Sequence, residues 1–188
     1  MGSNPSQFKD DPANPVKDVS WDDTKPFLTK LNDARLVNQW RFGLPTEAQW
    51  EYACRAGTKT AWSFGDSNNM LSEYAWTGSD SKGKPHPVGK LKPNFFGIHD
   101  VHGNVWEWCN DFGENGYYAN APEDDPPGPS VGSVNVLRGG CWHFNPEHSV
   151  SMSRFMSVST GRLGNHGFRL ALIIVGTSGN TAQRSGKK

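Results

Sequence analysis

The sequence has no excess of charge of either sign and no long apolar run. It contains 19 basic and 19 acidic residues among 188, whereas proteins that bind nucleic acid or anionic membranes usually carry a basic excess or a basic patch. The longest apolar stretch, 170–175, is far shorter than the roughly 20 residues of a membrane-spanning helix. We therefore expect neither nucleic acid nor a membrane among the partners of this protein.

A signal peptide and paired cysteines are also missing. Residues 1–6 lack the basic and apolar segments of a secretory signal, which favours a cytoplasmic location, while a truncated start would leave a surface or secreted location open. The three cysteines, Cys54, Cys109 and Cys141, form no close pairing motif. An odd number of cysteines in this arrangement predicts three separate thiols and no disulfide framework.

Glycine, proline and tryptophan are abundant instead, with 21, 13 and 8 residues, and this composition predicts a loop-rich chain. Two helices are indicated in the first third of the sequence. Ser20 followed by Asp23 resembles a capping box and predicts a helix over 21–33. Thr46 followed by Gln49 gives the same signal for a second helix over 47–56.

After residue 58, short apolar stretches separated by Gly, Asn, Asp and Pro predict short strands. These stretches are 60–64, 87–89, 105–108, 134–138 and 168–175. The chain is therefore expected to form one α+β domain over residues 1–176 with two early helices and short antiparallel strands. The polar residues 177–188 are expected to form a disordered tail.

Six segments, in their order and spacing, resemble the formylglycine-generating enzymes of the sulfatase-modifying-factor family. They are residues 4–8, 15–21, 44–53, 96–108, 137–142 and 167–170. The resemblance covers residues 3–172 and implies a C-type-lectin-like α+β fold with little regular secondary structure. Members of this family usually carry a further N-terminal segment with strands that complete the sheet, and this chain starts after it.

The resemblance also implies the loss of the catalytic cysteines. In the enzymes, an Arg-Gly-Gly-Ser-Trp motif leads into two cysteines that bind copper(I) and oxidise a cysteine of the sulfatase peptide to formylglycine. Here the motif reads Arg-Gly-Gly-Cys-Trp over 138–142, and an ungapped alignment places Phe144 and Ser149 at the two cysteine positions. Copper(I) needs soft thiolate ligands, so the resemblance implies a pseudoenzyme without catalytic residues.

A structural calcium site of the family is matched more closely. Asp100, Gly103, Val105 and Glu107 stand at its positions, and calcium prefers carboxylate and carbonyl oxygens of this kind. We expect calcium as a structural cofactor and do not expect copper or iron. In the alternative interpretation, Asp100 is only a turn residue and Glu107 only a buried hydrogen-bonding acid.

Other residues of the family motifs are expected to be structural. Trp106, Trp108 and Trp142 should pack in the core. Arg138 and Arg169 should brace loops through their five N–H donors. The helical glutamates Glu47 and Glu51 are candidates to pair with these arginines.

The first functional hypothesis is a non-catalytic module that binds a protein or peptide, because loops on a rigid frame often carry binding residues. Variable proteins of diversity-generating retroelements, which are related to this family, use the same region to bind ligands. The predicted surface consists of His143, Phe144, His148, Met152, Phe155, Met156, Leu163 and His166.

Two alternatives remain open at this point. One is a divergent metal-dependent oxidoreductase that uses Cys141, His143 and His148. The other is a fragment whose missing part or partner carries the activity. The sequence identifies neither the ligand nor the oligomeric state.

Overall fold

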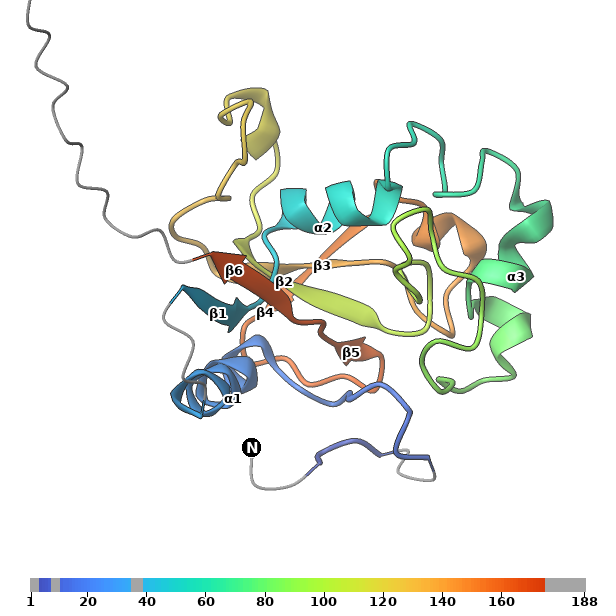
Figure 1. The fold of residues 1–188 in the computed structure, drawn as a ribbon, viewed down its shortest axis with the longest axis horizontal. Coiled ribbons are helices and arrows are strands. Elements are labelled where there is room, and N and C mark those ends of the chain that lie inside the picture. Colours follow the sequence, from blue (N-terminus) through green and yellow to red (C-terminus); the bar gives the residue numbers. More distant parts are fainter. Residues whose placement is uncertain (1–3, 8–10, 35–38, 175–188) are drawn as a thin grey trace, which may run out of the picture.

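The computed structural model describes residues 4–7, 11–34 and 39–174. Its helices are short and its strands form two separate sheets (Figure 1), so the predicted α+β class is confirmed. No helix within these ranges is long and apolar enough to cross a membrane. The tail predicted for 177–188 lies outside the described residues.

Both predicted helices are present. Helix α1 spans Trp21–Asp33, and Ser20 and Asp23 form the expected capping box. The Ser20 side chain accepts from the backbone N–H of Asp23 at 3.1 Å, and the Asp23 carboxylate accepts from the N–H of Ser20 at 2.9 Å. Helix α2 spans Glu47–Arg55 and has an equivalent box at its N-terminus. It ends one residue earlier than predicted because Ala56 adopts a left-handed conformation, with φ of 48°.

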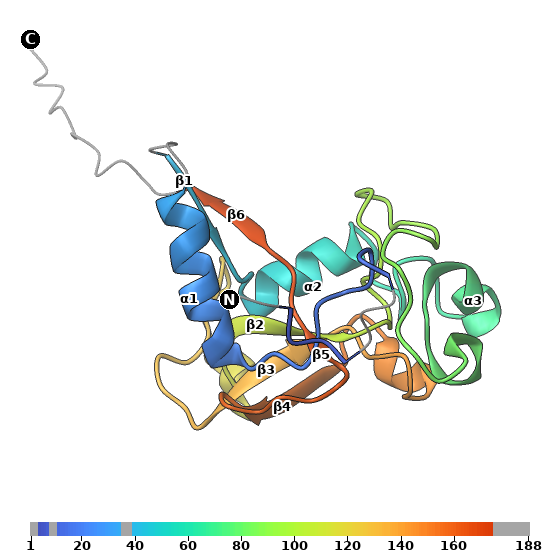
Figure 2. The same cartoon turned by 90° about the horizontal axis from the view of Figure 1, so that it is seen from below.

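The larger sheet has four strands in the order β4-β3-β2-β5. Strands β2 (Trp106–Phe112), β3 (Val134–Arg138) and β4 (Arg154–Val158) pair antiparallel, and β5 (His166–Gly167) pairs parallel to β2. A separate antiparallel ladder joins β1 (Trp40–Gly43) to β6 (Ala171–Ile174). Figure 2 shows α1, β1 and β6 side by side.

The strand predictions were right in part. The strand expected at 134–138 is β3, and the strand expected at 105–108 continues to residue 112 as β2. The stretch 168–175 contains only β6, after a break that separates it from β5. The strands predicted at 60–64 and 87–89 are wrong: the first contains only an isolated bridge from Trp62 to Gly65. Trp62 contributes instead to a side-chain cluster with Leu71 and Ala75.

Several elements had no sequence prediction. They are β1, β4, β5, the short helix α3 (Leu71–Tyr74) and the 3-10 turns η1 (Asn68–Met70), η2 (Gly78–Ser81), η3 (Tyr117–Ala119) and η4 (Pro146–Ser149). The turns η1 and η2 and the helix α3 lie in the long loop region between α2 and β2. The turn η4 lies between β3 and β4, where it shapes the candidate site.

The alternation of side chains along β2 divides the core between the two faces of the sheet. On one face Trp106 and Trp108 pack with Leu137 of β3. On the other face Cys109 packs against Trp50 of α2, which lies along the sheet in Figure 1. The predicted core positions of Trp106 and Trp108 are confirmed at 1% and 0% exposure. Trp142, by contrast, is only half-buried.

Candidate functional site

The segment after β3 begins with a buried thiol. Cys141 has no exposed surface. Its Sγ lies 3.6 Å from Nδ1 of His143 and accepts from the Asn165 amide at 3.5 Å. Burial raises the pKa of this thiol above its usual value. The thiolate that a soft metal or an oxidation reaction needs is therefore disfavoured at neutral pH.

An aromatic group follows Cys141. The ring of Phe144 contacts His143 at 4.5 Å and His148 at 5.2 Å between centroids. Its other neighbour is Trp106, whose ring also stacks on Phe155 at 5.6 Å. Phe144 therefore links two exposed histidines to an aromatic pair on the sheet, and this small surface is shaped by packing.

Ser149 is fixed in the interior behind this surface. It has no exposed area, and its hydroxyl donates to the carbonyl of Pro146 at 2.7 Å and accepts from the indole of Trp62 at 3.2 Å. Its own carbonyl accepts from Nδ1 of His102 at 2.7 Å, since Nε2 of that ring accepts the N–H of Ser63. Ser149 thus holds η4 in place. The supporting roles of Trp62 and His102 had no signal in the sequence.

The loop after η4 is held by Arg138, which is 1% exposed. Its guanidinium donates to the carbonyls of Ser151 and Met152 at 2.7 and 3.1 Å. It also forms ion pairs with both glutamates of α2, Glu47 and Glu51. The predicted pairing of the helical glutamates with Arg138 is confirmed, whereas Arg169 pairs with Glu107.

Some residues of the predicted binding surface are exposed, whereas two others do not belong to it. Met152, Phe155 and Leu163 are exposed, at 69%, 37% and 49%. Met156 alternates with Phe155 along β4 and points to the opposite face of the sheet, toward Gly113. His166 has no exposed area, because β5 pairs with β2 and places its ring against Trp108. His166 is therefore removed from the surface.

The three residues predicted to bind a redox metal do not form a common site in the structure. Cys141 and His143 are in contact, but His148 does not join them. Within the described residues no group of three His, Cys, Asp or Glu side chains is placed to hold a metal ion. The second polar neighbour of the Cys141 Sγ is the side-chain amide of Asn165, which donates to it at 3.5 Å.

Three of the four residues predicted to bind calcium line one cavity of about 350 Å³, namely Asp100, Val105 and Glu107, and Gly103 does not. Burial raises the pKa of Asp100, and one of its oxygens accepts the N–H of Gly89 at 2.7 Å. Glu107 is bound by the Arg169 guanidinium at 2.5 and 2.7 Å. The indole of Trp50 also donates to Glu107, at 2.6 Å, so both oxygens of this carboxylate already have partners.

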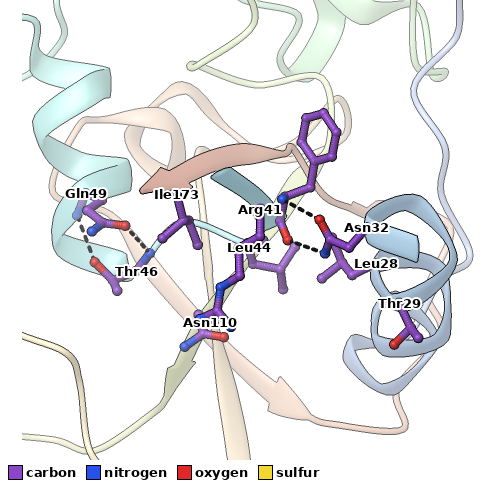
Figure 3. A pocket seen from close by; sticks show the side chains of 11 residues that line it. Leu28, Thr29, Asn32, Arg41, Leu44, Thr46, Gln49, Asn110 and Ile173 are labelled. Carbon is purple, nitrogen blue, oxygen red and sulfur yellow. Dashed lines mark hydrogen bonds between the residues drawn. The ribbon is translucent and has the colours of Figure 1, made fainter. Parts of the chain in front are cut away.

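A second cavity, of about 410 Å³, opens between α1, β1 and the start of α2 (Figure 3). Its wall includes Arg41, Asn110 and Asn32. The Asn32 amide is already bonded to the N–H and carbonyl of Phe42. None of the residues predicted to bind a ligand or metal lines this cavity, and it lies apart from the aromatic group at Phe144.

On the side of the sheet that faces α2, the carboxyl group with the largest pKa shift is that of Asp111. It is 2% exposed, one oxygen accepts the N–H of Glu47 at 2.8 Å, and the other has no partner within the described residues. Burial raises its pKa from 3.8 to about 7, and the Glu47 charge adds to the effect. The folded protein therefore holds a proton that the unfolded chain releases above pH 4, so this contribution to stability falls as pH rises from 4 through 7.

We expect Asp111→Asn to remove this pH dependence. At pH 8 the variant should be more stable than the wild type by about 1–2 kcal/mol, which allows for screening by solvent and by nearby Arg154. Urea unfolding at a series of pH values from 5 to 8 measures the difference. Asp124→Asn, at an exposed acid, is the control and should keep the wild-type slope. Parallel pH profiles for wild type and Asp111→Asn would contradict the prediction.

Comparison with known proteins identifies the family of this chain. Residues 1–174 match the sulfatase-modifying factor enzyme 1-like domain. The chain belongs to the sulfatase-modifying-factor family. It is 35% identical to the formylglycine-generating enzyme of Streptomyces coelicolor over 92% of this chain and 57% of that protein. The chain thus spans little more than half the length of that relative.

Two further relatives of the family are informative. A bovine protein named inactive C-alpha-formylglycine-generating enzyme 2 is 31% identical over 84% of this chain and 50% of its own length. The solved structure of Treponema denticola variable protein 1 superposes with a TM-score of 0.83 at 32% identity, over 90% of this chain and 77% of that one. The fold of the formylglycine-generating enzymes predicted from the sequence is therefore confirmed.

Proposed function

We propose that this chain is a non-catalytic member of its family that binds a protein or peptide at the surface formed by His143, Phe144, His148, Met152 and Phe155. The main support for this proposal is the surroundings of the two residues that the alignment places at the catalytic positions. Phe144 and Ser149, which the alignment places there, are committed to packing and to internal hydrogen bonds. The nearest thiol, Cys141, is fully buried.

The relatives support this proposal. The bovine relative is named as an inactive enzyme, so a member of the family without activity has a precedent. The likeness to a Treponema variable protein supports a role as a variable protein of a diversity-generating retroelement. If so, sequences of this locus from related isolates should differ mainly within 143–166 and remain constant along β2 and β3. The C-type-lectin likeness of the fold remains a prediction.

The chemistry of the surface suits a peptide. Phe155 lies on β4, at one edge of the described four-stranded sheet. A peptide in extended conformation can add to such an edge through main-chain hydrogen bonds. The exposed side chain of Met152 can adapt to partners of different shape, and rigid aromatic rings serve as anchors. Neither nucleic acid nor a membrane is proposed as a partner, and a cytoplasmic location stays a prediction.

A displayed library of random peptides tests the binding role. Peptides selected on the wild-type protein should lose at least about tenfold in affinity for Phe155→Ser, because truncating a central aromatic anchor costs on the order of 1–2 kcal/mol. Val158→Ser, on the same strand but facing the other side of the sheet, is the matched control and should bind normally. Equal binding by both variants would overturn the assigned surface.

The absence of catalysis has its own test. We expect no formylglycine when the purified protein is incubated with copper(I) and a cysteine-containing sulfatase peptide, as followed by mass spectrometry. Formation of the aldehyde would overturn the proposal. The alternative oxidoreductase rests on the contact between Cys141 and His143. One tightly held copper or iron that is lost on replacing His143 would favour that alternative.

We also propose that calcium binds in the cavity lined by Asp100 and Glu107. The cation would take the place of solvent beside the desolvated Asp100 carboxylate. Added calcium should raise the midpoint of thermal unfolding, since a ligand of the folded state alone stabilises it. Asp100→Ala should abolish that increase, whereas Asp66→Ala, at an exposed acid outside the cavity, should retain it. A midpoint that calcium leaves unchanged would contradict the proposal.

A further inference from the structure

The cavity of about 410 Å³ between α1, β1 and the start of α2 lies apart from the proposed binding surface. Its volume is within the range of about 300–1,000 Å³ that is typical of sites for small molecules. Figure 3 shows side chains of α1 on one side of this cavity and side chains of α2 on the other, with Arg41 and Asn110 between them. The proposed function uses none of the residues that line it.

Hydrogen bonds between neighbouring elements hold the walls of this cavity in place. The side chain of Asn32 on α1 donates to the carbonyl of Phe42 at 2.9 Å and accepts from its N–H at 2.8 Å, which ties α1 to β1. The N–H of Asn110 on β2 donates to the carbonyl of Pro45 at 2.9 Å, which ties β2 to the segment before α2. Because the cavity is preformed in this way, little conformational entropy is lost when a ligand binds.

Most of the polar side chains that line the cavity already have hydrogen-bond partners within the protein. Thr46 and Gln49 bond to each other in the capping box of α2, and the Gln49 amide also donates to Asp125 at 3.1 Å. The Thr29 hydroxyl donates to the carbonyl of Lys25 at 3.1 Å. These groups therefore shape the cavity and leave few polar atoms for a ligand.

Arg41 and Asn110 are the exceptions. Both are exposed, and neither side chain takes part in a hydrogen bond or an ion pair among the residues that the structure describes. No acidic residue is among those that line the cavity, so the protein supplies no carboxylate to the Arg41 guanidinium there. A guanidinium can form two parallel hydrogen bonds with a carboxylate, and the Asn110 amide adds a further donor.

The remaining wall of the cavity is apolar. It includes Leu28, Leu44 and Ile173, and Leu44 is 4% exposed and packs with Leu28 in the core. Ile173 lies against Gly43, where a Cβ would be 2.5 Å from its Cδ1, so the glycine leaves room for this side chain. A ligand with an apolar body can contact this wall while its charged end faces Arg41.

We infer that this cavity binds a small carboxylic acid with an apolar body. Arg41 and Asn110 bind the carboxylate, and the apolar body contacts Leu28, Leu44 and Ile173. A phosphate ion fits less well, because a single guanidinium balances only part of its charge and the apolar wall gives it no favourable contact. The same carboxylate chemistry occurs at the C-terminus of a peptide, so the experiment includes both sources. The inference does not depend on the proposed peptide-binding surface.

Titration of the isotope-labelled protein with isocaproate, followed by NMR, tests the inference. The backbone amides of Gly43 and Asn110 should shift. Isocaproamide, which has the same shape without the charge, should bind at least about tenfold more weakly. A short peptide ending in leucine, compared with its C-terminal amide, distinguishes a chain end from a free acid. Binding of either acid form with loss in its amide supports the inference, whereas no shift with either acid, or displacement of isocaproate by an equal concentration of inorganic phosphate, contradicts it.

Three variants locate the binding. Arg41→Gln should weaken the binding of isocaproate at least about tenfold, because it removes the charge and keeps a polar side chain. Lys30→Gln removes the same charge from an exposed position on α1 outside the cavity and should bind normally. Thr29→Phe keeps Arg41 but places a ring in the cavity, and it should prevent binding. Midpoints of thermal unfolding show that all three variants fold. Equal affinities of Arg41→Gln and Lys30→Gln for isocaproate would overturn the inference.

Discussion

Arg138→Ala is expected to lower the free energy of unfolding by about 3–5 kcal/mol, the usual loss when one partner of a buried ion pair is removed. The side chain is 1% exposed and is the shared partner of Glu47 and Glu51 on α2. Its removal would leave the buried Glu47 carboxylate with Arg154 as its remaining cation. It would also leave the carbonyls of Ser151 and Met152 without this donor.

Two further variants separate this explanation from a general effect of losing an arginine. Arg138→Lys should recover only part of the stability, because an ammonium cannot reach two carboxylates and two carbonyls in the planar arrangement of a guanidinium. Arg162→Ala removes an exposed pair with Asp23 and should cost less than about 1 kcal/mol. Urea unfolding measures all three. A loss for Arg138→Ala as small as that for Arg162→Ala would contradict the buried-network interpretation.

The two helices could be predicted because their signals are local. The Ser20–Asp23 and Thr46–Gln49 boxes are formed by residues three positions apart, and both are present with the expected hydrogen bonds. Strand β1 had no such signal. Its partner β6 begins at Ala171, so the pairing that defines it joins segments separated by most of the chain. Likewise, β4 is a strand because β3 lies beside it.

The candidate site was predicted from the positions of residues in the sequence motifs. Their burial in the folded structure shows which of them lie on the surface. His143 is exposed, and Phe144 is half-buried where it packs against the cluster around Trp106. His166 has a polar ring that suits a surface, but its two-residue strand beside Trp106 places it in the interior. Phe155 and Met156 face opposite sides of the sheet because successive side chains alternate along a strand. No strand was predicted at 154–158, so the sequence could not show which of the two is exposed.

Gly140→Ala should disturb the site more than any other single methyl addition in the motif at 138–142. Gly140 has φ of 80°, and a Cβ there would lie 2.8 Å from the carbonyl oxygen of His148 and 2.9 Å from Cα of Ser149. Both contacts are with backbone, so the η4 turn itself must move. The cost should be about 2–4 kcal/mol, from left-handed strain of about 1 kcal/mol together with overpacking.

Gly57→Ala is the matched control, because Gly57 also has positive φ, at 91°, but a Cβ there would meet nothing within 4 Å. It should cost only about 1 kcal/mol, the strain that both substitutions share. Urea unfolding gives the two free energies. Binding of a library-selected peptide should weaken in Gly140→Ala, since η4 carries His148, and should be unchanged in Gly57→Ala. Equal losses of stability in the two variants would show that the close approach of Gly140 to η4 does not constrain the site.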